Sequence, residues 1–414
     1  MDVVNPASSL LQGTGYLPRV SMRDGRAVEE ALAPATLLDK GAQLDGVVIE
    51  ASYAFNRPPL LKRLRDDRVV RIMDPQSLRF TGERYLQTTA LTRLPYAPSE
   101  PITVLGFDAA QAKRLAQGSM IYAQDRGTDI HLAPGLALPD TELAIWSDHN
   151  ERILEAACAA NGAGDVDRLP MLALVAPGAR AISRPEETVK RLVDYPVDGV
   201  YVQATNLAPT TDSVEKFAAF VQYLDAIRCA GLSVCVGRVG AFGLLLQALG
   251  FGPFDSGLGH AEAHALAGLN RRMTDAELAR RKDPDKRSGP SRRVYLEPLK
   301  TTMKAPQAGT LLSDEAIRAA LACTLGCCHF RDLGGLSGRA RQHYVFTRRK
   351  EVDVLRKLPV PAMRLAHIEN QLRDAERLAE RATHAFPDAD LPNFAHLGRW
   401  LRLLAREQGV ALAA

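Results

Sequence analysis

Long apolar segments are missing from this sequence, and no run approaches the roughly 18 residues that a membrane-spanning helix needs. Cysteine is also scarce, with six in 414 residues. This number excludes a disulfide-stapled scaffold and favours a reducing compartment. The opening residues, MDVVNPASSLLQGTG, lack the basic start and long apolar centre of a signal peptide. We therefore expect a cytoplasmic globular protein without a membrane partner.

The net charge is small, at +4, but the charges are distributed unevenly. Residues 271–304 contain eleven Lys or Arg residues against five Asp or Glu residues. A basic segment of this kind suits a polyanion such as nucleic acid, and a solvated surface loop is the alternative interpretation.

Short apolar runs recur along the first two thirds of the chain and alternate with segments of helical periodicity. The eight candidate strands are residues 31–36, 46–51, 69–74, 128–133, 171–176, 199–204, 232–238 and 253–256. The candidate helices between them are residues 60–65, 109–125, 151–160, 185–193, 213–229 and 241–249. Eight strands in this alternation predict an α/β fold of the (β/α)8 barrel type, with a doubly wound sheet as the alternative.

The alternation ends near Ala263. The following residues 270–292 are charged and rich in helix breakers, which is typical of an excursion or loop, and residues 294–299 predict an extra strand outside the barrel. Four Arg-rich segments of helical periodicity come next, at residues 314–325, 341–355, 362–384 and 391–408. We predict a barrel over residues 1–310 and a C-terminal helical appendage over residues 311–414.

The carboxyl ends of the strands line the active sites of α/β barrels. Near these ends the sharpest feature is a pair of carboxylates, Asp74 on the third strand and Asp255 on the eighth. Two carboxylates in one mouth can divide the nucleophilic and proton-transfer roles at a sugar carbon, whereas in the alternative each caps the turn that follows it. The candidate substrate-binding residues at the same mouth are Ser52, Asn56, Gln76, His131, Gln203, Asn206, Arg238 and Gly240.

Cysteine and histidine gather in the C-terminal third, where the candidate metal ligands are Cys323, Cys327, Cys328 and His343. Thiolate and imidazole ligands at short spacing suit structural zinc. The spacing matches no regular zinc motif, and cysteines buried in a helix are the alternative. A second candidate binding feature is the turn Gly237-Arg238-Val239-Gly240, whose backbone amides could hold a phosphate.

Several segments, in order along the chain, resemble the tRNA-guanine transglycosylase superfamily. RDGRA at residues 23–27 resembles the opening D-G-x-A-R region, and DGVVIEASYAFNRPP resembles the stretch ending I-I-L-x-N-T-Y-H-L-x-x-R-P-G. IMDPQSLRF lies where the family has T-D-S-G-G-F-Q-V-F-S-L, and VCVGRVGAFGLLLQALGFGPFDSG resembles Y-L-M-G-V-G, a helix, and G-x-D-M-F-D-C-V. The resemblance places Asp74 on the family's proton-transferring aspartate and Asp255 on its nucleophile.

The sequence departs from the family where the family reads its base. D-E-C becomes Ala133-Pro134-Gly135, V-Q-G-G becomes VAPG at residues 175–178, and the G-G-L-A-V-G-E region becomes VQATN at residues 202–206. The cysteine cluster falls where the family has its C-x-C-x-x-C…H zinc site, but Leu325 stands at the middle cysteine, Cys327 is the available substitute, and the histidine comes early.

The resemblance implies a transferase, a pentosyltransferase or N-glycosidase, that exchanges a base in tRNA or DNA for a purine or deazapurine, as in queuosine-type modification. Asp255 would attack C1′ of the nucleotide and Asp74 would transfer a proton. Structural zinc and a homodimer are compatible with this class. Two alternatives remain open: a catalytically silent relative that binds nucleic acid or a partner protein, and a barrel enzyme for a small phosphorylated metabolite.

Overall fold

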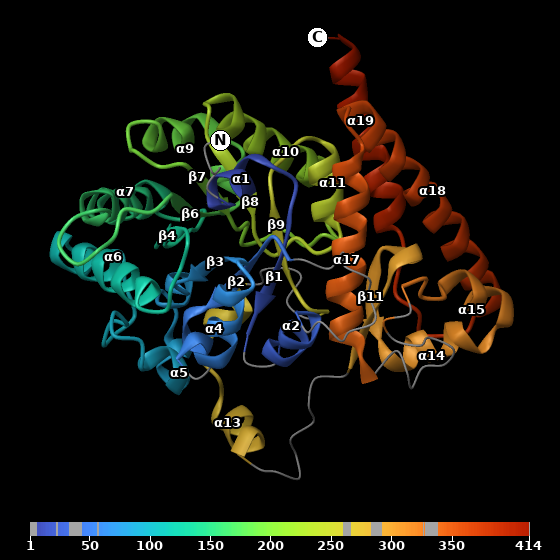
Figure 1. The fold of residues 1–414 in the computed structure, drawn as a ribbon, viewed down its shortest axis with the longest axis horizontal. Coiled ribbons are helices and arrows are strands. Elements are labelled where there is room, and N and C mark those ends of the chain that lie inside the picture. The colour runs from blue at the N-terminus through green and yellow to red at the C-terminus, as the bar shows by residue number, and fades with distance from the viewer. Residues whose placement is uncertain are drawn as a thin grey trace.

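The computed structural model describes residues 6–21, 24–32, 44–55, 58–259, 266–282, 292–325, 327 and 338–413. At its centre, eight parallel strands follow the order β3-β2-β1-β9-β8-β7-β6-β4, and an isolated parallel bridge from Ile72 to Ile130 joins the two ends. The strands are β1 (Tyr16–Val20), β2 (Gly46–Glu50), β3 (Val70–Asp74), β4 (His131–Ala133), β6 (Met171–Pro177), β7 (Gly199–Val202), β8 (Ser233–Val236) and β9 (Phe254–Gly257). The prediction of a (β/α)8 barrel is confirmed (Figure 1).

The first strand is not the one that the sequence pattern indicated. Seven predicted strands coincide with β2 to β4 and β6 to β9, but the barrel begins with β1, which pairs in parallel with β2 and β9. Ala31, the start of the predicted strand, ends the helix α2 (Gly25–Ala31), and residues 33–36 lie outside the described part of the chain. The sequence YLPRV hid the strand, because a proline and an arginine interrupt its apolar pattern.

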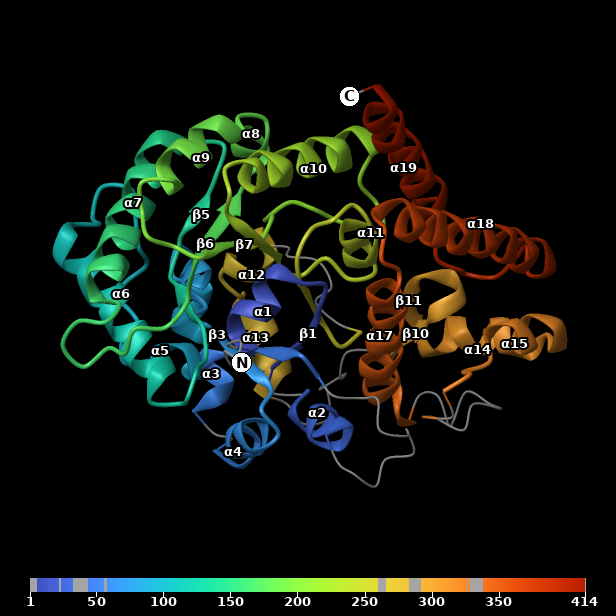
Figure 2. The ribbon, with the colours of Figure 1, turned by 45° about the horizontal axis from the view of Figure 1, so that its top comes forward.

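Helices surround the strands as the periodicity predicted (Figures 1 and 2). The layer contains α4 (Pro58–Asp66), α6 (Ala109–Gln124), α7 (Leu143–Ala160), α9 (Pro185–Leu192), α10 (Val214–Cys229) and α11 (Phe242–Ala248). Side chains that cap helix amides fix two of the starts, with Asp108 before α6 and Ser213 before α10. The helix after β1 is α2, and the remaining, eighth position is taken by α17 (Ala340–Lys357), which contacts α2, α11 and β1.

An antiparallel hairpin of β10 (Arg293–Leu296) and β11 (Thr301–Lys304) lies outside the barrel, where an extra strand was expected. It leads into α14 (Ala305–Ser313) and α15 (Glu315–Leu321), and the long helices α18 (Pro361–Ala385) and α19 (His396–Ala413) complete this side of the molecule (Figure 2). The ring of Trp400 in α19 is buried 5.7 Å from the ring of Phe242 in α11. The appendage is therefore packed directly against the barrel.

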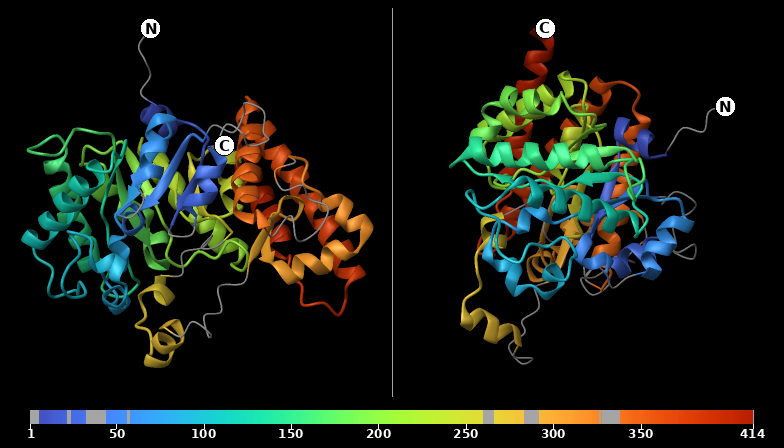
Figure 3. Two further views of the ribbon diagram at one scale, coloured as in Figure 1. Left: turned by 60° about the horizontal axis from the view of Figure 1, so that its bottom comes forward. Right: turned by 90° about the vertical axis from the view of Figure 1, so that its left-hand side faces the viewer.

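The remaining elements are short. They are α1 (Pro6–Gln12), α3 (Ala51–Ala54), the 3₁₀ turns Ser77–Arg79, Glu83–Gln87 and Glu297–Leu299, α5 (Thr89–Thr92), β5 (Ala137–Leu138), α8 (Ala179–Ile182), α12 (Leu266–Asn270) and α13 (Asp275–Lys282). Within the charged excursion, α13 projects away from the body of the molecule (Figure 3).

Two apolar layers hold the barrel together. The outer layer fills the space between strands and helices. The inner layer fills the barrel itself, and residues of α1, among them Leu10 and Leu11, join it near the amino ends of the strands. Among the described residues, no helix combines the length and apolar character that crossing a lipid bilayer requires.

Candidate functional site

The inner layer of the barrel changes from apolar to charged at the carboxyl ends of the strands. Side chains alternate between the two faces of a strand, so residues two positions apart point the same way. Leu17, Val48 and Ile72 lie in the apolar inner layer. The residues two positions later are Arg19, Glu50 and Asp74, and they face the same interior. The mouth of the barrel is therefore built from ionisable groups.

Arg19 joins the two predicted catalytic aspartates. Its Nε donates to Oδ1 of Asp255 at 3.0 Å, and its Nη2 donates to Oδ2 of the same carboxylate at 2.8 Å. Its Nη1 donates to Oδ2 of Asp74, and Nη2 also donates to the hydroxyl of Tyr201 at 2.6 Å. All three charged side chains are buried, with Arg19 exposed by 1%, Asp74 by 5% and Asp255 by 0%. Two aspartates that are 181 positions apart in the sequence therefore meet at one guanidinium.

The electrostatics keep this arginine charged. Burial by itself lowers the pKa of a guanidinium, but the carboxylates of Asp255 and Asp74 outweigh that effect and raise the pKa of Arg19 above its usual value. Burial raises the pKa of Asp255, and the guanidinium of Arg19 opposes that shift. The guanidinium of Arg19 therefore stabilises the ionised form of Asp255, because burying a carboxylate without a partner costs free energy.

Arg238 also contacts Asp255, through its backbone amide. It has a left-handed backbone with φ of 58°, and its amide donates to Oδ1 of Asp255 at 3.2 Å. Its Nη2 donates to Oε1 of Glu50 at 2.8 Å, so a second ion pair lies at the mouth. Burial and the neighbouring Arg19 lower the pKa of Arg238. The predicted turn after β8 is therefore bound to the carboxylate through one backbone amide.

Gln76 and Ser52 fix the other carboxylate. Gln76 also has a left-handed backbone, with φ of 57°, and its amide donates to Oδ1 of Asp74 at 2.7 Å. The amide of Ser52 in turn donates to Oε1 of Gln76 at 2.9 Å. The loop after β3 is thus tied both to its own strand and to the start of α3. Strained backbone of this kind concentrates at functional sites.

The other predicted substrate-binding residues are more dispersed. Gln203 is buried directly after β7, Asn206 is exposed further along the same loop, and Gly240 lines a cleft toward the appendage. His131 points toward the helices rather than into the mouth, because Ile130 and Leu132 on either side of it face the barrel interior. Its Nε2 lies 3.2 Å from the carbonyl oxygen of Asp167, and burial lowers its pKa. Asn56 lies outside the described residues.

Sequence reasoning missed Arg19 and Tyr201, which hold the site together. The signal for Arg19 was a single arginine in the short, mainly apolar segment YLPRV, because apolar packing does not explain a charged side chain there. The sequence gives no such signal for Tyr201, because a tyrosine within an apolar strand is common in barrel interiors. Its ring lies against Gly237, where an added Cβ would come within 2.7 Å of ring atoms.

Three of the four predicted metal ligands lie together beside the β10–β11 hairpin. The Sγ atoms of Cys323 and Cys327 are 3.5 Å apart, and Sγ of Cys327 is 3.3 Å from Nδ1 of His343. Nε2 of His343 donates to the carbonyl oxygen of Tyr295 at 3.1 Å, which leaves the Nδ1 lone pair facing the sulfur atoms. This Cys2His group could hold a metal ion. Cys328 lies outside the described residues.

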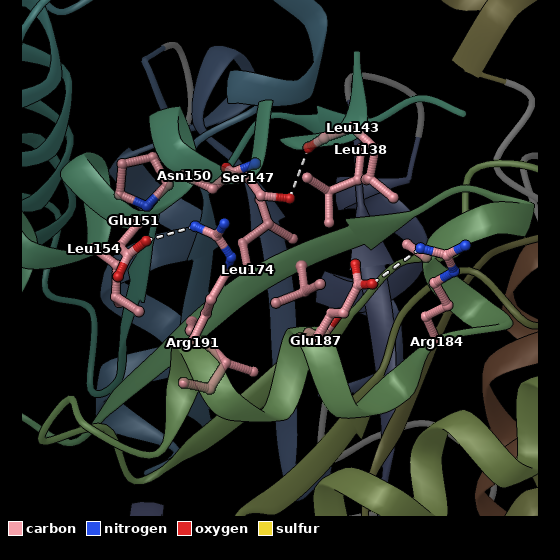
Figure 4. Close-up of a pocket in the computed structure, with 16 residues that line it drawn as sticks. Leu138, Leu143, Ser147, Asn150, Glu151, Leu154, Leu174, Arg184, Glu187 and Arg191 are labelled. Carbon is pink, nitrogen blue, oxygen red and sulfur yellow. Dashed lines mark hydrogen bonds and ion pairs between the residues drawn. The ribbon is translucent and has the colours of Figure 1, made fainter. Parts of the chain in front are cut away.

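A small cavity of about 60 Å³ lies outside the barrel, between α7 and α9 (Figure 4). Its lining is mainly apolar, with Leu138 and Leu174 on the side of the strands. At its rim, Arg191 pairs with Glu151 at 2.5 Å. None of the predicted site residues lines this cavity, so it belongs to the packing between helices and strands rather than to the mouth.

Comparison with known proteins adds no assignment. The chain matches no protein-family model, and no curated protein sequence matches it.

Proposed function

We propose that this protein is a base-exchange glycosyltransferase that acts on a nucleic acid. The observation that supports the proposal is the meeting of Asp74, at the carboxyl end of β3, with Asp255, the second residue of β9, around the guanidinium of Arg19. The same two residues match the catalytic pair of the transglycosylase superfamily, to which several segments of the sequence are similar. In barrel enzymes this end of the strands carries the chemistry.

In the proposed reaction, a carboxylate oxygen of Asp255 attacks C1′ of the nucleotide. The bond from C1′ to the base nitrogen breaks, and the base leaves with the electron pair and takes up a proton from water. A second base then gives its proton to Asp74 and attacks C1′, which releases the carboxylate of Asp255. The guanidinium of Arg19 favours the carboxylate form of Asp255. Oδ1 accepts hydrogen bonds from both Arg19 and the amide of Arg238, whereas Oδ2 accepts one from Arg19 and retains a second lone pair for the attack.

The incoming base is proposed to be a purine or deazapurine, and the target a nucleotide in tRNA or DNA. A base must leave its stack before C1′ can reach a buried carboxylate, at a cost of a few kcal/mol. Single strands and loops are therefore easier substrates than duplexes.

One observation favours a second candidate function, a catalytically silent subunit that binds nucleic acid or a partner protein. Asp255 has no exposed surface, and both of its oxygens accept hydrogen bonds from Arg19. Attack at C1′ therefore requires the side chains that cover the carboxylate to move aside. A subunit without catalysis requires no such movement. In such a subunit the ion pairs of Arg19 with Asp74 and Asp255 would only link the strands of the barrel.

The experiment is base exchange, measured as incorporation of labelled guanine or a labelled 7-deazapurine into tRNA and single-stranded DNA. We expect incorporation by the unmodified protein and a loss of at least about 10³-fold in Asp255→Asn, as for removal of other nucleophiles. Asp74→Asn should also reduce the rate. Asp129→Asn is the matched control, because the carboxylate of Asp129 accepts its hydrogen bonds from Arg71, which is not a mouth residue. Salt-dependent binding without incorporation contradicts exchange and supports the silent subunit.

We also propose that Cys323, Cys327 and His343 hold structural zinc. The donor set supports this, because zinc prefers thiolate and imidazole ligands, and the hydrogen bond from Nε2 of His343 sets the tautomer that a metal needs. Bound zinc would cross-link the segment before α17 to the helix itself. Elemental analysis of the purified protein tests the proposal. A content near one zinc per chain supports it, and less than about 0.2 contradicts it, because structural zinc binds tightly.

A further inference from the structure

A cleft of about 680 Å³ runs between the mouth of the barrel and the appendage. On the barrel side it is lined by Gly240 after β8, Gly259 after β9 and the loop at Thr210 after β7. On the appendage side it is lined by the β10–β11 hairpin and α19, which lie beside the barrel in Figure 2. Its volume falls in the range of ligand-binding clefts, about 300–1,000 Å³.

The cleft is lined by cations and by no carboxylate of a described residue. Arg293 and Lys304 are both exposed and stand directly opposite each other in the antiparallel hairpin. Side chains in such a pair lie on the same face with their Cβ atoms about 5 Å apart, and like charges there are destabilising. In the described part of the chain neither residue forms an ion pair, and the acidic residues Glu351 and Glu297 pair with Lys300 and Lys350 instead. An anion between them would remove the repulsion.

Two further cations line the cleft, and they differ in role. The ammonium group of Lys300 lies 2.5 Å from Oε1 of the buried Glu351, so its charge is balanced within the protein. Arg399 donates from Nη2 to the carbonyl oxygen of Thr210 at 2.5 Å, whereas its Nε is buried and, among described residues, has no hydrogen-bond partner. A buried donor of this kind is costly unless a ligand accepts from it.

We propose that this cleft binds the phosphodiester backbone of a single-stranded nucleic acid, with Arg293, Lys304 and Arg399 as the phosphate contacts. The inference rests on the proposed function for the choice of ligand. The cleft begins at Gly240, two residues after the amide that donates to Asp255, and at Gly259, four residues after Asp255 itself. A strand in the cleft would therefore pass beside the carboxylate while its base turns toward the mouth.

The experiment measures binding of a fluorescent single-stranded 12-mer, as RNA and as DNA, by anisotropy over a series of salt concentrations. The double variant Arg293→Gln/Lys304→Gln removes the facing pair of charges, and both residues are exposed, so the fold should be retained. Each phosphate contact on a single strand contributes about 0.7 to the slope of log K against log salt. We expect the double variant to bind more weakly and its slope to fall by about 1.4.

The matched control is Lys113→Gln/Arg114→Gln, which removes the same charge from exposed positions on α6, across the barrel from the appendage (Figure 1). Its slope should stay that of the unmodified protein. An equal fall in both double variants, or no fall in either, overturns the assignment. A calorimetric titration with uridine 5′-monophosphate tests the other source of phosphate. If the mononucleotide binds as tightly as the strand and needs the same two residues, the ligand is a small phosphorylated molecule and the strand assignment is wrong.

These results are separable from a failure of the proposed function. If base exchange is not detected while the slope still depends on Arg293 and Lys304, the cleft assignment stands and glycosyl transfer is contradicted. If base exchange occurs with an unchanged slope, the cleft assignment is contradicted and glycosyl transfer stands.

Discussion

Replacing Arg19 with methionine retains much of the side chain's apolar volume but removes the guanidinium that both aspartates contact. The change leaves the carboxylates of Asp74 and Asp255 buried, close together and without their shared counter-ion. We expect the free energy of unfolding at pH 7 to fall by about 5 kcal/mol, the upper end of the cost of breaking a buried ion pair. Domains are stable by only about 5–15 kcal/mol, so the variant should be close to unfolding.

The loss should depend on pH in a definite direction. Burial already raises the pKa of Asp255 above its usual value, and removing Arg19 leaves that effect unopposed. A carboxyl group with a higher pKa in the folded state binds more protons when folded, so the free energy of unfolding falls as pH rises above the unfolded-state pKa of about 4. The deficit of Arg19→Met relative to the unmodified protein should therefore shrink between pH 7 and pH 4.

Urea unfolding followed by circular dichroism at both pH values measures this deficit. Arg71→Met is the matched control, because Arg71 makes a comparable pair with Asp129, whose side chain is 34% exposed, and a solvated pair contributes at most about 1 kcal/mol. If Arg19→Met loses no more stability than Arg71→Met, or loses the same amount at pH 4 and pH 7, the reasoning about the buried cluster is refuted.

Two further predictions concern the surroundings of the site. Gly243→Ala should lower the free energy of unfolding, measured by urea denaturation, by about 1–3 kcal/mol, because the new Cβ would lie 2.1 Å from the ring of Phe254, which precedes Asp255. Gly268→Ala is the control and should cause no such loss, because no atom lies within 4 Å of its new Cβ. Equal losses in the two variants would contradict the packing argument. In thermal unfolding, a zinc chelator should lower the Tm of the unmodified protein and leave that of His343→Ala unchanged, whereas an equal shift in both would contradict the Cys2His site.

The sequence predicted most of the barrel because seven of its strands are apolar runs and the helices between them carry apolar residues at helical spacing. It failed at β1, where Arg19 occupies an inward-facing position that an apolar residue usually fills. The sequence could also name the two aspartates, since each lies near the end of a predicted strand. Asp74 does end β3, whereas Asp255 is the second residue of β9. It could not predict that one guanidinium joins them, because the donor and its acceptors are 55 and 236 positions apart and only the strand register brings them together.

The metal ligands illustrate the same limit. Their short spacing indicated a local cluster, but the orientation of His343 is set by the carbonyl group of Tyr295, 48 positions away in the β10–β11 hairpin. The sequence could not predict which way the side chain of His131 points, for a related reason. Its strand was predicted correctly, but which of its two faces lines the barrel depends on the neighbouring strands.

The most direct test of glycosyl transfer is a search for the covalent intermediate. The protein is incubated with the oligonucleotide, denatured rapidly and digested, and the peptide that contains Asp255 is examined by mass spectrometry. The account predicts an added nucleotide without its base, joined through C1′ to the carboxylate of Asp255 and absent from Asp255→Asn. No adduct under saturating oligonucleotide, or the same adduct in Asp255→Asn, would contradict it.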